Sequence, residues 1–149
     1  MKKTKQQHRR WGSVALLLLV FAVLLVACEG EESKRHLSVL RQLAADTAVY
    51  PGFKQVDISH NNKRGRARLF LYYNSPASYD EVKRFYSKNL LANGWELYPK
   101  EVRRGILSDL SDSAQVFRKG EYEMAILRES LDLDPTARNY VIAYVWEQN

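Results

Sequence analysis

The chain has 149 residues, enough for one domain of ordinary size and too few for two. It is 46% hydrophobic and 27% charged, a composition typical of a folded protein rather than a disordered one. The formal net charge is +6, but lysines and arginines before residue 12 supply +5 of it, so the remainder is close to neutral. A near-neutral domain lacks the basic surface that binds phosphate backbones, which argues against a nucleic-acid partner.

The N-terminal segment has the parts of a secretory signal. Residues 1–11 are basic, residues 14–27 are uninterrupted apolar sequence, and the run ends in Leu-Val-Ala-Cys at Cys28. This ending resembles the lipobox of bacterial lipoproteins. The resemblance implies cleavage before Cys28 and diacylation of its sulfur. Cys28 is the only cysteine in the sequence, so no disulfide within the chain is expected.

An uncleaved signal anchor is the alternative interpretation of this segment. As a helix, the apolar run spans only about 21 Å of a hydrocarbon core that is ~30 Å thick. Extending the helix from Trp11 to Cys28 gives about 27 Å, which local thinning of the bilayer tolerates. Both interpretations place the following domain outside the cytoplasm, because the basic residues precede the apolar run. We therefore expect an exported protein held at the membrane by its N-terminus.

Three segments follow from this division of the chain. Residues 1–27 are expected to be a signal peptide or signal anchor, and residues 28–34 a charged tether. Residues 35–149 are expected to form one extracytoplasmic domain. Its first element is predicted to be a helix that Ser33 caps and that runs to about Thr47, with leucines at helical spacing.

A β-hairpin and a second helix are predicted next. Residues 54–60 and 66–73 alternate apolar and polar side chains on either side of an Asn- and Gly-containing turn. Ser78 and Glu81 form a capping box, followed by Val82, Phe85, Tyr86 and Leu90 as one apolar stripe. Gly94 lies where a left-handed residue ends a helix, so this helix is expected from about Tyr79 to Ala92 or Asn93.

The last part of the sequence predicts strands. They are expected over residues 95–98, in a hairpin over residues 114–127 that turns at Lys119 and Gly120, and over residues 140–147. The order α-β-β-α-β-β-β-β predicts an α+β fold, an antiparallel sheet of about five or six strands with two helices on one face. The turn at residues 50–53, the capped helix and its stop at residues 94–95 resemble small bacterial exported domains of unknown function. That resemblance implies a fold and no activity.

The sequence offers little material for catalysis or for a metal or cofactor site. The three histidines, His8, His36 and His60, are far apart, and no phosphate loop or nucleophile motif occurs. We therefore expect no catalytic residues, no metal and no cofactor. The acids of two loops, at residues 109, 112, 132 and 134, fit solvated carboxylates better than a calcium site.

The most suggestive surface is aromatic. If Ala67, Leu69 and Leu71 face the helices, their neighbours along the strand face away. We expect Val141, Ala143 and Val145 of the last strand to share the helix side. These two choices predict one exposed face that binds a peptide, a glycan or another protein, formed by Arg68, Phe70, Tyr72, Tyr140, Tyr144 and Trp146. The contrary prediction is that the alternation is reversed and these aromatic side chains belong to the core.

The function predicted from these features is that of a lipid-anchored envelope protein with a non-catalytic binding or accessory domain. Its partners are expected to be the membrane, through the N-terminus, and an envelope protein, peptide or glycan. Two alternatives stay open at this point. One is a small extracytoplasmic hydrolase that uses loop carboxylates such as Asp109 and Asp112. The other is an uncleaved single-pass membrane protein with a structural domain.

Overall fold

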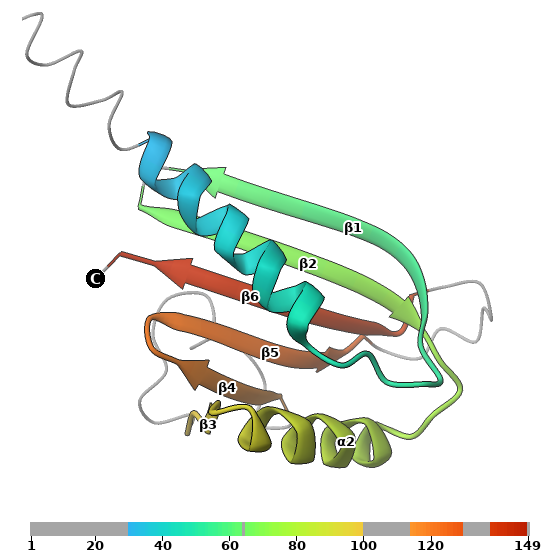
Figure 1. The fold of residues 1–149 in the computed structure, drawn as a ribbon. Helices are drawn as coiled ribbons and strands as arrows, with labels where there is room; N and C mark the ends of the chain where they lie inside the picture. The colour runs from blue at the N-terminus through green and yellow to red at the C-terminus, as the bar shows by residue number, and fades with distance from the viewer. Residues whose placement is uncertain (1–29, 64, 100–113, 130–137, 149) are drawn as a thin grey trace, which may run out of the picture.

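The structure is a computed structural model that describes residues 30–63, 65–99, 114–129 and 138–148. It is an α+β fold in which two helices cover one face of a six-stranded antiparallel sheet, as the sequence predicts (Figure 1). Cys28 and the four loop aspartates lie outside the described residues. In the part of the chain described, no helix is long and apolar enough to cross a membrane.

The sheet has the strand order β1-β2-β6-β5-β4-β3. The last strand therefore lies in the middle, between two hairpins that are separated in sequence by α2. The strands are β1 (Lys54–Lys63), β2 (Arg66–Asn74), β3 (Glu96–Leu97), β4 (Gln115–Lys119), β5 (Tyr122–Arg128) and β6 (Tyr140–Glu147).

Within the described residues, helix α1 covers residues 30–46, so it extends further toward the N-terminus than predicted. Residues 30–34, expected as part of the tether, are helical, and Ser33 lies inside α1 rather than at its N-cap. The Ser33 hydroxyl instead donates to the carbonyl oxygen of Lys63 at the end of β1, at 2.7 Å. The predicted cap at Ser33 is therefore wrong, because this side chain makes a tertiary contact that local sequence does not encode.

Helix α2 (Tyr79–Ala92) has the predicted bounds and caps. The Ser78 hydroxyl accepts from the backbone amide of Glu81, and the Glu81 carboxylate accepts from the backbone amide of Ser78. Asn93 ends the helix, and Gly94 follows it with φ of +77°, a conformation that favours glycine.

The main core lies between the sheet and the two helices. Leu40 of α1 and Val82 and Tyr86 of α2 are buried against side chains that point up from β2, β6, β5 and β4. Figure 1 shows both helices on the same side of the sheet, with α1 crossing in front of β2 and β6 and α2 beside β3 and β4. The strand residues of this core include Leu69, Leu71, Phe117, Met124, Ile126, Ile142 and Tyr144.

Strand β1 forms one edge of the sheet and is exposed along almost its whole length. The pairing with β2 is interrupted between Gln55 and Asp57, so Val56 sits at an irregularity and is 42% exposed. Asp57 accepts a hydrogen bond from the backbone amide of Ile58 at 2.7 Å. A charged side chain that occupies an edge amide hinders the addition of a further strand.

Candidate functional site

The six residues predicted to form one exposed face do not share a face. Strand β2 has the predicted orientation, with Leu69 toward the helices and Phe70 away from them. Strand β6 has the opposite orientation to the one predicted, because Leu69 is directly opposite Tyr144 in the ladder and Phe70 is opposite Ala143. Residues directly opposite each other in an antiparallel pair point to the same side of the sheet.

Tyr140, Tyr144 and Trp146 are therefore core residues, and their predicted exposure is wrong. They are 0%, 1% and 3% exposed and pack under the helices. The physical reason is volume: two helices arch over the central strand, and large rings fill that space where valine and alanine leave gaps. Burial raises the pKa of the Tyr144 phenol well above its ordinary value.

Arg68, Phe70 and Tyr72 remain on the side of the sheet away from α1 and α2, and each is partly buried. We call this side helix-free with respect to the described residues. Tyr72 lies under the guanidinium of Arg138, 4.5 Å from the ring centroid, and its hydroxyl is 3.3 Å from that of Ser59. A guanidinium over an aromatic face is an attractive contact. Phe70 packs beside the buried small side chains of this side, which are Val116, Ala125, Ala143 and Val145.

Arg68 lies on this surface in the same row across the sheet as Val145, Glu123 and Arg118. Its guanidinium pairs with the carboxylate of Glu147, and only 14% of the Arg68 side chain is exposed. The Nε of Arg68 is buried and, within the described part of the chain, has no hydrogen-bond partner. An unsatisfied buried donor costs about 1–3 kcal/mol, so this guanidinium retains unused bonding capacity.

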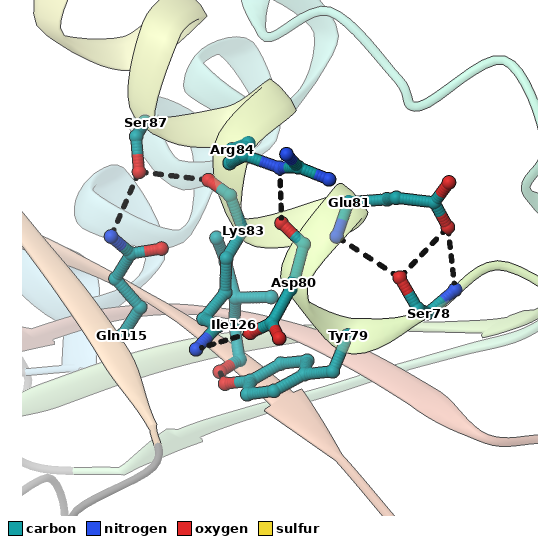
Figure 2. Close-up of polar contacts among 9 residues, drawn as sticks. All are labelled: Ser78, Tyr79, Asp80, Glu81, Lys83, Arg84, Ser87, Gln115 and Ile126. Carbon is teal, nitrogen blue, oxygen red and sulfur yellow. Dashed lines mark hydrogen bonds and ion pairs between the residues drawn. The ribbon is translucent and has the colours of Figure 1, made fainter.

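A charged cleft of about 460 Å³ lies beside the first half of α2 (Figure 2). Its lining comes from α2 and from the first residue of β4: Asp80, Lys83, Arg84, Ser87 and Gln115. The helical members are spaced i, i+3, i+4 and i+7, the spacing of one helix face. This polar stripe is the sequence signal that could have indicated the cleft, although it does not indicate Gln115.

The polar groups of the cleft bond mainly to one another (Figure 2). The Lys83 ammonium lies 3.0 Å from a carboxylate oxygen of Asp80 and 4.8 Å from the centre of the Tyr79 ring. The hydrogen bond from Lys83, and then its charge, hold the pKa of Asp80 below its usual range. Gln115 donates to the Ser87 hydroxyl at 2.8 Å, and that hydroxyl donates to the Lys83 carbonyl.

A second polar cluster joins α1 to the sheet around His36. The His36 ring stacks on Trp146 with centroids 3.6 Å apart and planes 9° from parallel. Its Nδ1 is 2.9 Å from the Tyr122 hydroxyl, and the Trp146 indole N–H donates to the Glu121 carboxylate at 2.8 Å. His36 is only 7% exposed. The cluster is therefore a structural contact that holds α1 against β5 and β6. The sequence places these residues too far apart to reveal it.

Among the described residues, no group of three or more His, Cys, Asp or Glu side chains could hold a metal ion.

The chain was compared with family models, with curated proteins and with solved structures, and none of the three comparisons gives a significant match. The fold alone therefore classifies the protein, as a small α+β domain with a six-stranded antiparallel sheet and two helices on one face. The family resemblance of residues 50–98 gains no support from these comparisons.

Proposed function

We propose that the protein is a non-catalytic binding or accessory domain of the cell envelope, exported and attached to the membrane by lipid on Cys28. The support for export and attachment is the order of parts before Cys28, which is basic, then apolar, then lipobox-like. In this proposal the α+β domain acts outside the cytoplasm.

The observation that carries the binding role is the helix-free surface at β2, formed by Arg68, Phe70 and Tyr72. Arginine and aromatic side chains are enriched at protein interfaces, where they supply large contact area with a polar end. Here they are only partly exposed and lie beside a well-packed patch of small side chains. This combination fits a protein or peptide partner of the envelope.

The cleft beside α2 fits a structural role better than a catalytic one. A general acid needs a pKa near the working pH. The contact with Lys83 shifts the pKa of Asp80 in the opposite direction, so its carboxylate is an anion at neutral pH. Hydrogen bonds from the backbone and hydroxyl of Ser78 likewise lower the pKa of Glu81, which caps α2. These acids stabilise the helix rather than supply protons.

Site-specific photo-cross-linking in the native membrane tests the binding role. A photoreactive residue in place of Phe70, in the full-length protein, is expected to yield one discrete protein or peptide adduct. Val49, which is 50% exposed on the loop after α1, is the matched control and should give none. Tyr72→Ala should weaken the adduct several-fold while the protein stays folded. Equal labelling from both positions would contradict the proposed surface, and a glycan adduct would change the partner class.

A further inference from the structure

The start of α1 is already fixed to the sheet. Ser33 is 1% exposed and bonded to the Lys63 carbonyl, and His36 is stacked on Trp146 one turn later. The helix is continuous from residue 30 through these contacts. Residues 30–34 therefore cannot act as a flexible tether, and only Glu29 separates Cys28 from the folded domain.

This arrangement limits how far the domain can lie from the membrane. Two peptide units span no more than about 7 Å even when fully extended. A bilayer is ~40–45 Å thick in total, and its hydrocarbon core is ~30 Å thick. The remainder is divided between two headgroup regions, so each is about 5–8 Å thick. This inference rests on the proposed function, in which Cys28 is acylated. If it is, the first described turn of α1 lies in or against the headgroups. An uncleaved anchor that ends at Cys28 imposes the same limit.

The first turn of α1 has several neighbours at the same end of the sheet, which we call the basal end. In the ladders, Lys63 is opposite Arg66, Arg66 is opposite Glu147, and Tyr122 is opposite both Lys119 and Trp146. Figure 1 shows the tips of β1 and β6, the start of β2 and the β4–β5 turn together at this end. The basal end comprises residues 30–36, 63, 65–66, 119–121 and 147–148.

The exposed charges of the basal end suit a phospholipid surface. Its exposed cations are Lys34, Arg35, Lys63, Arg66 and Lys119. Lys63 and Arg66 stand directly opposite each other, an arrangement of like charges that is destabilising unless an anion lies nearby. Two acids of this end have cationic partners, Glu31 with Lys34 and Glu147 with Arg68, whereas Glu121 accepts from the uncharged indole of Trp146. Glu32 is also exposed here.

The geometry points to the basal end as a lipid-facing surface, which rests on phospholipid headgroups and holds the sheet with its strands rising from the membrane. The short connection at Cys28 brings this end to the bilayer, and the cations Lys63 and Arg66 lie against lipid phosphates. The domain then has one orientation, with Phe70 and Tyr72 further from the membrane than Arg66 along β2.

A depth measurement on the full-length protein tests this orientation. Asn62→Cys and Gln55→Cys are a matched pair, since both are exposed polar residues of β1 and neither change alters a charge. They are separated by about 23 Å at ~3.3 Å per residue. Each variant carries a fluorophore and is reconstituted into vesicles of phosphatidylethanolamine and phosphatidylglycerol that contain a headgroup-attached quencher. Quenching is expected to be several-fold stronger at position 62 than at position 55.

Equal quenching at the two positions, or stronger quenching at position 55, would overturn the proposed orientation. Failure of the membrane attachment itself has a different signature, because the protein would then not float with the vesicles in a density gradient.

A linker variant tests whether the short connection sets the orientation. About twenty glycine and serine residues inserted between Glu29 and Gly30 have an r.m.s. length of about 25 Å. The protein should still float, but the quenching difference between positions 62 and 55 should fall several-fold. An unchanged difference would overturn the role of the short connection.

Discussion

Tyr144 is the side chain that shows which row of β6 belongs to the core. It is 1% exposed in the middle of β6, with Trp95 across the core at a ring-centroid distance of 6.5 Å. Tyr72 lies on the other side of the sheet and is half-buried. The two tyrosines therefore have different roles, the first in packing and the second on the proposed binding surface.

We expect Tyr144→Ala to lower the free energy of unfolding by about 3–5 kcal/mol, the usual cost of removing a buried large aromatic side chain. Tyr72→Ala is the control and should cost markedly less, because its ring is partly in solvent already. Urea unfolding of the detergent-solubilised protein, followed by tryptophan fluorescence, measures both. Similar losses for the two variants would contradict the assignment of Tyr144 to the core.

Buried phenols also make stability depend on alkaline pH. Burial raises the pKa values of Tyr86 and Tyr144 well above 10.0, the ordinary value. The folded state then keeps its phenol protons where the unfolded state loses them, so stability is complete below about pH 10 and declines as the pH rises beyond it. Urea unfolding between pH 8 and pH 11 should show this decline, and Tyr86→Phe should reduce it. A pH-independent stability over that range would contradict the buried state of these hydroxyls.

At the scale of single elements, a side-chain cap stabilises the start of α2. Ser78→Ala removes the side chain that accepts from the Glu81 amide, so we expect a loss of about 1 kcal/mol in the free energy of unfolding. Ser78→Asp should preserve most of the stability, because aspartate is also a good N-cap. Thermal unfolding followed by circular dichroism checks both variants. An alanine variant as stable as the aspartate variant would show that the cap contributes nothing.

The apolar stripe of α2 has unequal members. Val82, Tyr86 and Leu90 are buried, whereas Phe85 is half-buried and packs on the edge of the core against Tyr50 and Tyr86. We expect Leu90→Ala to cost about 2–5 kcal/mol, and Phe85→Ala less than the ~3–5 kcal/mol of a fully buried phenylalanine. Urea unfolding of both variants tests this order, which a larger loss for Phe85→Ala would contradict.

At the scale of the whole molecule, the proposed function depends on Cys28. Mass spectrometry of the mature protein should find a diacylglyceryl group on the sulfur of an N-terminal Cys28. Cys28→Ser should release the domain from the membrane fraction or leave it unprocessed. Recovery of intact residues 1–27 on the membrane-bound wild-type protein would refute the lipoprotein proposal and favour the signal anchor.

Local sequence determined the elements of this protein well. The bounds of α2 follow from the capping box at Ser78 and the glycine at Gly94, because both act within a few residues of the chain. The bounds of β6 and the α+β class follow in the same way from alternation and element order. These signals need no knowledge of the rest of the fold.

Tertiary structure decided which side of each strand is core. Alternation along β6 is the same whichever face is buried, so only the pairing of Tyr144 with Leu69, and the volume under two helices, selects the aromatic row. The cleft beside α2 and the polar cluster around His36 likewise bring together residues that are distant in sequence. Residues 30–34, whose charges predict a tether, are helical, and the Ser33 hydroxyl bonds to the Lys63 carbonyl. Local sequence does not encode this contact, because the two residues are 30 positions apart in the chain.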